Sequence, residues 1–156
     1  YIQPLFVPAK TTDTNAVSYS ARGTKYGDVV RTSDRAITTD RSKNTGGKGQ
    51  GVTSTGLYMS ALAVSCSQAV REAAKGMQLD DVRVEVNHNG DGTFTRLITL
   101  YGDLTDDEVE TLRAAGASST VDGYVEKGEI ETTAETASLE RRRRQNKLHR
   151  AERLGK

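Results

Sequence analysis

The sequence predicts an α+β fold that combines short antiparallel strands with one long apolar helix. Gly51–Gly76 is a run of small and apolar residues with helical spacing, and it follows a glycine-rich loop. Val82, Val84 and Val86 alternate with polar residues, and the turn NHNGDGT leads into a partner strand at Phe94–Tyr101. This hairpin and the long helix are the two features that fix the fold class.

The chain is expected to open with an irregular arm over residues 1–15, because Pro4 and Pro8 are incompatible with a helix there. A domain over residues 16–137 follows. Its first part is expected to be a small antiparallel meander of three strands, at Val17–Arg22, Val29–Thr32 and Arg35–Thr39. A polar, glycine-rich loop over Asp40–Gly51 separates the meander from the long helix.

The long helix is expected to begin at the cluster Thr53–Thr55, which offers an N-cap, and to end at Gly76. One face carries residues at spacings of three and four: Leu62, Cys66, Ala69, Val70, Ala73 and Met77. Further apolar residues widen this face, so we expect the helix to lie in the centre of the protein.

Three elements are expected after the hairpin. Thr105 and Glu108 form a capping box for a helix over Asp106–Ala115, which Gly116 is expected to end. Val121–Lys127 is expected to be a short helix, and Glu129–Thr133 a closing strand.

Composition excludes several classes of protein. The chain has 156 residues and one cysteine, so it has no disulfide framework within the chain and no cysteine-based zinc site. No apolar run approaches the roughly 20 residues that a membrane span requires. The opening YIQPLFVPAK lacks the pattern of a secretory signal, so we expect a cytoplasmic protein. His88 and His149 are isolated, and we expect neither a metal nor a cofactor.

The charge is unevenly distributed along the chain. Residues 138–156 hold eight basic and two acidic residues, a net charge of +6, while residues 1–137 have a net charge of −5. A helical tail of this composition would present positive charge on most of its circumference and could neutralise phosphates. The candidate phosphate-binding residues are Arg141, Arg142, Arg143, Arg144, Lys147, Arg150 and Arg153. A solvated tail is the alternative interpretation.

Cys66 is the candidate for redox chemistry. Its neighbours on the same helical face are apolar, which is typical of a buried structural thiol. A reactive thiol would need a positive partner to lower its pKa and a path for substrate.

The order of the segments resembles the OsmC/Ohr family, the osmotically induced protein C and organic hydroperoxide resistance proteins. The resemblance covers roughly residues 40–135, and its best pieces are LYMSALAVSC at Leu57–Cys66 and FTRLITLYGDLTDDEVETL at Phe94–Leu112. It implies an α+β fold, an intertwined homodimer with active sites at the subunit interface, and thiol-dependent reduction of hydroperoxides. Cys66 matches the attacking cysteine, and Arg22 lies where the family often has an arginine.

The chain departs from the family pattern at two places. The family's resolving cysteine opens a Cys-Pro-Val segment, which here reads Ser119-Thr120-Val121. A hydroxyl cannot form that disulfide, which excludes the two-cysteine cycle. The family's Pro-x-Glu segment reads Thr55-Gly56-Leu57, so the acidic residue that orients the arginine is also missing.

Three hypotheses follow from the resemblance and its departures, of which the least specific is a protein that binds a small molecule in the dimer-interface pocket after loss of the chemistry. The first is a one-cysteine hydroperoxide reductase that uses Cys66, with Arg22 as electrostatic stabiliser and an external thiol as reductant. The second is a catalytically degenerate protein whose tail, residues 138–156, binds RNA or a ribonucleoprotein such as the ribosome.

Overall fold

The computed structural model describes residues 10–137, 147, 150–152 and 154 of the chain. It divides the chain into two compact units, which we describe separately. The first unit comprises Tyr1–Ser54 and Thr132–Lys156, and the second comprises Thr55–Glu131. Most of the expected N-terminal arm and most of the basic tail lie outside the described residues.

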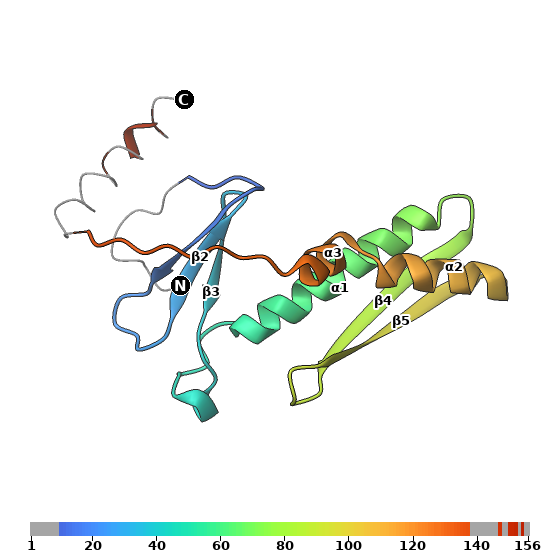
Figure 1. Cartoon of the computed structure of the whole chain (residues 1–156), viewed down its shortest axis with the longest axis horizontal. Helices are drawn as coiled ribbons and strands as arrows, with labels where there is room; N and C mark the ends of the chain where they lie inside the picture. Colours follow the sequence, from blue (N-terminus) through green and yellow to red (C-terminus); the bar gives the residue numbers. More distant parts are fainter. Residues whose placement is uncertain (1–9, 138–146, 148–149, 153, 155–156) are drawn as a thin grey trace. The chain divides into compact units, whose positions relative to one another are not determined.

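The first unit contains a three-stranded antiparallel meander, as the sequence predicts (Figure 1). Its strands are β1 (Ala16–Ser20), β2 (Asp28–Thr32) and β3 (Arg35–Thr39), with β2 in the middle. Val29 on β2 lies between Tyr19 and Thr38 in the register and is completely buried. β1 ends at Ser20, so Arg22 belongs to the turn that follows it.

The β2–β3 turn is a tight two-residue turn. Ser33 and Asp34 adopt positive φ angles of 50° and 55°, as the two central residues of a type I′ hairpin do. The Asp34 carboxylate accepts a hydrogen bond from the Thr11 backbone N–H, and the Asp34 N–H donates to Thr11 Oγ1. Thr11 is thereby buried against the turn.

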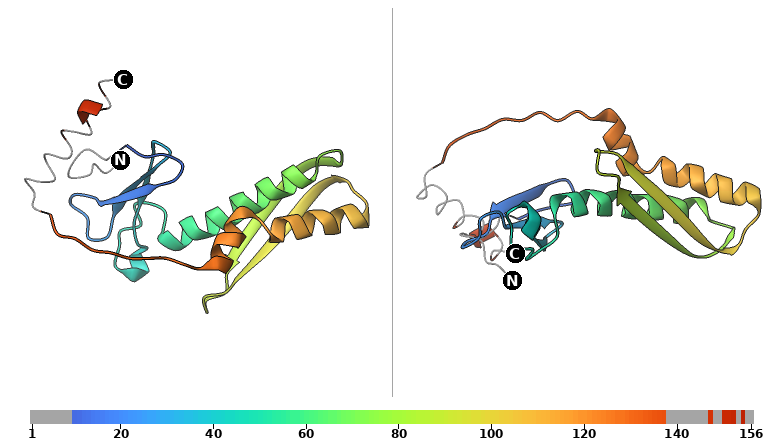
Figure 2. Two further views of the ribbon diagram at one scale, coloured as in Figure 1. Left: turned by 45° about the horizontal axis from the view of Figure 1, so that its top comes forward. Right: turned by 90° about the horizontal axis from the view of Figure 1, so that it is seen from below.

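The second unit packs helices onto a long hairpin. Helix α1 (Ser54–Ala73) is followed by the antiparallel strands β4 (Gln78–His88) and β5 (Phe94–Asp103). Helices α2 (Asp106–Ala117) and α3 (Thr120–Lys127) complete the unit, and the two views of Figure 2 show α1 and α2 running beside the hairpin. The elements agree with the expected α+β fold.

The core of the second unit lies between α1, α2 and the inner face of the hairpin. Cys66 and Val70 of α1 and Leu112 of α2 are completely buried. Strand residues line the other side in register, because Val82 pairs with Leu100 and Val84 pairs with Ile98. The alternating pattern of the sequence therefore places Val82 and Val84 of β4 on the face that packs against the core cluster.

The expected closing strand is absent. Glu129–Thr133 forms no strand; these residues are exposed, and Ile130 is 91% accessible. Helix α1 is buried along one face, at Leu62, Cys66 and Val70, while Val64 is 53% exposed.

None of the described helices combines the length and apolarity needed to cross a bilayer.

Candidate functional site

Cys66 lies at the centre of the second unit, on the buried face of α1. Its side chain is fully inaccessible and packs in a cluster with Val70, Ala74 and Leu112. The neighbouring Ser65 is buried as well, at the same level of the helix. The thiol is therefore enclosed mainly by aliphatic groups.

Gly116 brings α2 into close contact with the Cys66 sulfur. A Cβ atom added at Gly116 would lie 2.9 Å from Cys66 Sγ and 2.7 Å from Ile98 Cδ1. Gly116 was expected to end the helix, but it lies inside α2, which continues to Ala117. Its role is to permit close approach of two helices and a strand, which no residue with a side chain would allow without a shift.

An arginine reaches the same region from the hairpin. Arg96 on β5 forms a two-armed ion pair with Asp122 on α3, with Nη1–Oδ1 at 3.2 Å and Nη2–Oδ2 at 3.1 Å. Arg96 Nη1 also donates to the Leu62 carbonyl oxygen on α1, at 3.4 Å. The guanidinium thus connects β5, α3 and α1.

The N-terminus of α3 completes this network. Ser119, which is 3% exposed, donates its hydroxyl to Asp122 Oδ2 at 2.7 Å, and its N–H donates to the same oxygen at 3.0 Å. The Asp122 N–H in turn donates to Ser119 Oγ, which makes a capping box. The Val121 N–H donates to Ser65 Oγ at 3.0 Å, so α3 is also tied to α1.

The electrostatics of the site follow from burial and from this ion pair. Burial raises the pKa of the Cys66 thiol above its ordinary value; the positive charge of Arg96 acts to lower that pKa, and the Asp122 carboxylate acts to raise it. For Asp122, burial alone would raise the pKa of the carboxyl. The hydrogen bonds from Arg96 and Ser119 outweigh burial and hold that pKa below its usual value.

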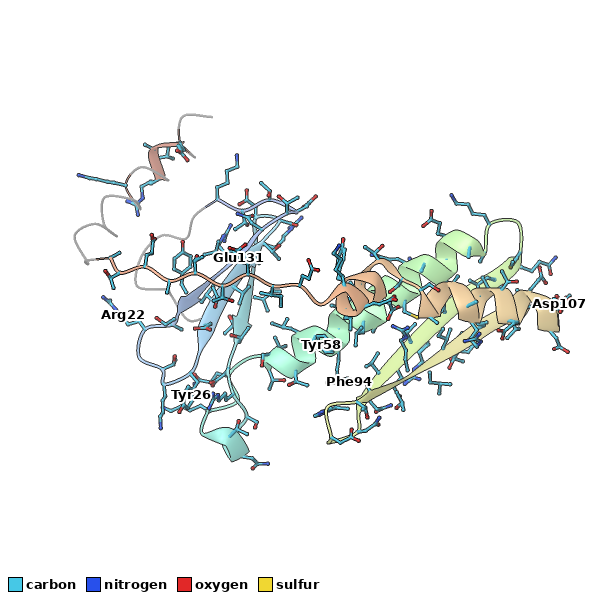
Figure 3. The ribbon with its side chains drawn as sticks, in the orientation of Figure 1. Arg22, Tyr26, Tyr58, Phe94, Asp107 and Glu131 are labelled. Carbon is cyan, nitrogen blue, oxygen red and sulfur yellow. The ribbon has the colours of Figure 1, made fainter. Side chains whose placement is uncertain are left out.

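The structure separates the sequence-predicted residues into different units. Cys66 belongs to the second unit, whereas Arg22 is an exposed residue of the first. Figure 3 labels Arg22 on the loop that follows β1. Lys147 and Arg150 are helical and exposed, and the other candidate residues of the tail lie outside the described residues. The association of Arg22 with Cys66 and the role of the tail stay predictions.

Sequence reasoning missed Arg96, the arginine whose charge acts on Cys66. A signal for it was present, because Arg96 shares the inward face of β5 with Ile98 and Leu100. An arginine at an inward position of a half-buried strand needs a partner. Among the described residues, no group of three or more His, Cys, Asp or Glu side chains is placed to hold a metal ion.

Solved structures with the same arrangement of elements are OsmC-type proteins. A protein of Psychrobacter arcticus described as an osmotic stress induced and detoxification response protein is 17% identical, with a TM-score of 0.59 over 77% of this chain and 90% of its own. An OsmC-like protein from Mycoplasma pneumoniae is 13% identical, with a TM-score of 0.58 over 72% and 86%.

An organic hydroperoxide resistance protein OsmC from Legionella pneumophila is 19% identical, with a TM-score of 0.50 over 71% of this chain and 87% of its own. Neither a protein-family model nor a curated protein sequence matches this chain. The fold of this chain is OsmC-like, and its single cysteine leaves it without a resolving partner within the chain.

Proposed function

We propose that this chain is an OsmC-like protein that has lost peroxidase activity and binds RNA or a ribonucleoprotein through its basic tail, residues 138–156. The observation that carries the loss of activity is the complete burial of Cys66 Sγ against Gly116 and aliphatic side chains. A nucleophilic thiolate needs access to its peroxide and a lowered pKa, and burial acts against both.

The groups that could assist Cys66 are engaged elsewhere. Arg96 is occupied by Asp122, whose negative charge opposes the effect of Arg96 on the thiol. Ser119, at the position of the family's resolving cysteine, serves as the N-cap of α3. These contacts support a structural role for the residues of the former active site, a role in which the network holds α1, β5 and α3 together.

The tail supports the binding half of the proposal. Its eight basic residues against two acidic residues favour a polyanionic partner, and phosphate contacts of this kind are independent of base sequence. Lys147 and Arg150 are exposed, as such contacts require.

Two measurements test the proposal. Peroxide consumption in the presence of dithiothreitol should be equal for the native chain and for Cys66→Ser; a rate that depends on Cys66 would refute the loss of activity. Binding of a labelled oligouridine should weaken with rising salt. Replacement of Arg141–Arg144 by glutamine should make the slope of log K against log salt concentration less negative by about 0.7 for each lost phosphate contact. Binding that is unaffected by salt and by this replacement would refute the tail as the binding element.

A one-cysteine peroxidase is the second candidate, favoured by the charge of Arg96 acting on Cys66. In this reaction the Cys66 thiolate attacks the peroxide, an S–O bond forms as the O–O bond breaks, and the alcohol leaves after protonation. Two equivalents of an external thiol would then reduce the sulfenic acid, releasing water and a disulfide of the reductant. The measurement with Cys66→Ser separates the two candidates.

We also propose that the protein forms a homodimer. Val64 on α1 is 53% exposed, and Leu97 on the outer face of β5 is 58% exposed. Apolar side chains that their own unit does not cover are typical of a protein interface. Light scattering should give twice the mass of the chain, and Val64→Asp should shift the mass toward the monomer. A monomeric native chain would refute the proposal.

A further inference from the structure

Two loops of the first unit carry positive charge without any acidic residue. Residues 21–27 read ARGTKYG and residues 41–51 read RSKNTGGKGQG. Their five basic side chains are all exposed: Arg22, Lys25, Arg41, Lys43 and Lys48. Within the part of the chain that the structure describes, none of these five forms an ion pair.

Tyr26 joins the two loops. The Arg41 guanidinium carbon lies 4.1 Å from the centroid of the Tyr26 ring, and Lys25 Nζ lies 5.3 Å from it, both within range of a cation–π interaction. The second loop also touches the ring through Gly46, where an added Cβ would lie 3.3 Å from Tyr26 Cε2. Tyr26 nevertheless remains 39% exposed. The labels of Figure 3 place Arg22 and Tyr26 on the same connection between β1 and β2.

The second loop has a fixed conformation, because a buried carboxylate organises it from inside. Asp40 is 6% exposed and accepts hydrogen bonds from the backbone N–H groups of Arg41, Lys48 and Gln50, at 2.7, 3.0 and 3.2 Å. The negative charge of Asp40 is therefore stabilised by backbone N–H groups of the loop. The basic side chains remain on the outside of a loop that is already ordered.

The first loop is ordered in a similar way. Thr24 Oγ1 accepts a hydrogen bond from the Gly27 N–H at 3.0 Å and donates to the Ala21 carbonyl oxygen at 2.9 Å. The Ala21 carbonyl oxygen and the Gly27 N–H are thus satisfied within the loop, whereas Lys25 and Tyr26 stay exposed. A preformed surface of this kind loses little conformational entropy when it binds a ligand.

We propose that these loops form a binding surface for single-stranded RNA, which we call the Tyr26 surface and define as Arg22, Lys25, Tyr26, Arg41, Lys43 and Lys48. Proteins that bind single strands combine basic side chains along the phosphate backbone with aromatic groups on which bases stack. The Tyr26–Arg41 pair supplies the stacking platform, since bases stack on both aromatic rings and guanidinium planes. The surrounding lysines supply the phosphate contacts.

This inference extends the proposed RNA binding to a surface outside the tail. It is tested in the full chain with a labelled oligouridine. The slope of log K against log salt concentration should become less negative by about 2 when Lys25, Lys43 and Lys48 are replaced by glutamine. This value assumes a change of about 0.7 for each lost phosphate contact. The matched control replaces three exposed residues of the second unit, Arg71, Lys75 and Lys127, by glutamine. This control should leave the slope unchanged. Equal effects of both sets would overturn the proposal, because they would indicate net charge alone.

A second variant tests the stacking. Tyr26→Leu should weaken binding of oligouridine about tenfold and leave binding of inorganic polyphosphate unchanged, whereas Tyr26→Phe should keep the native affinity. Thermal unfolding checks that both variants fold. Equal losses for oligouridine and polyphosphate, or no loss for either, would overturn the role of Tyr26.

Variants of the tail and variants of the Tyr26 surface distinguish the contributions of the two regions to RNA binding. If glutamines at Arg141–Arg144 abolish binding and the loop variants have no effect, the Tyr26 surface is refuted while the tail stands. If the loop variants weaken binding and the tail variant does not, the tail is refuted and the Tyr26 surface stands.

Discussion

Arg96 on β5 and Asp122 on α3 form a two-armed ion pair whose charges act in opposite directions on the Cys66 thiol. The pair is mostly buried, with side chains that are 19% and 24% exposed. It therefore has two consequences. It fixes α3 against the hairpin, and the Asp122 carboxylate opposes the effect of the Arg96 charge on the Cys66 thiol.

The balance predicts the effect of Asp122→Asn on the thiol. The amide keeps the shape of the side chain but removes the negative charge that raises the pKa of Cys66. That pKa should therefore fall, because the positive charge of Arg96 is no longer opposed by Asp122. Alkylation of Cys66 by iodoacetamide, followed by mass spectrometry across a pH series, should become faster, and its pH profile should shift to lower pH.

The control for this prediction is an exposed ion pair. Glu110 pairs with Arg113 on α2, and their side chains are 64% and 59% exposed. Glu110→Gln should leave the alkylation of Cys66 unchanged. If Asp122→Asn changes the rate equally at every pH, it has opened the site without moving the pKa, and the electrostatic argument fails.

Gly116 predicts a second effect, on stability. Gly116→Ala places a methyl group within 3.0 Å of Ile98 Cδ1, Cys66 Sγ and Val70 Cγ2, and should lower the free energy of unfolding by about 1–3 kcal/mol. Gly123 on α3 is the matched control, because an added Cβ there meets no atom within 4 Å. Gly123→Ala should be neutral or stabilising by up to about 1 kcal/mol. Urea unfolding measures the free energy of unfolding of both variants. A similar loss of stability in Gly116→Ala and Gly123→Ala would contradict the packing argument.

The elements with strong local signals were predictable from the sequence. The alternation of Val82, Val84 and Val86 gave the hairpin, and the capping box of Thr105 and Glu108 gave the start of α2. These signals depend on neighbours in the sequence. The closing strand at Glu129–Thr133 was wrong because a strand also needs a partner edge, which residue pattern alone does not supply.

The site was less predictable, since its contacts join residues far apart in the chain. Cys66 was correctly placed on the buried face of α1, but Arg96 is 26 residues from its partner Asp122. Gly116 has the same local signature as a helix end, but α2 continues through it to Ala117, and its close packing against Cys66 and Ile98 is not visible in the local sequence. Long-range packing decides such cases.

Ser65 and Val121 predict a third effect, because their hydrogen bond ties α3 to α1 across 56 residues of sequence. Ser65→Ala leaves the Val121 N–H without its acceptor in a half-buried position, which should cost about 1–3 kcal/mol. The matched control is Ser60→Ala, also on α1, where an exposed hydroxyl donates to the Gly56 carbonyl oxygen. It should change the free energy of unfolding by less than about 0.5 kcal/mol. Amide hydrogen exchange at Val121 should be faster in Ser65→Ala but not in Ser60→Ala. Equal exchange rates in the two variants would contradict a role for the hydrogen bond between Val121 and Ser65.

Asp40 predicts the response of the first unit to acid. The N–H of Gln50 lowers the pKa of the Asp40 carboxyl; burial opposes this effect, and the N–H groups of Lys48 and Arg41 and the charge of Lys48 add to it. Because the folded pKa lies below the unfolded value of about 3.9, the carboxylate stabilises the fold above that pH. The contribution is lost as pH falls through the folded pKa.

Asp40→Asn should therefore be less stable than the native chain at neutral pH, and the difference should shrink as pH falls from about 5 toward 2. Thermal unfolding at a series of pH values measures the difference, and Asp80→Asn, at an exposed position, is the control. A difference between Asp40→Asn and the native chain that stays constant down to the lowest pH would show that the loop depends on the shape of the side chain and not on its charge.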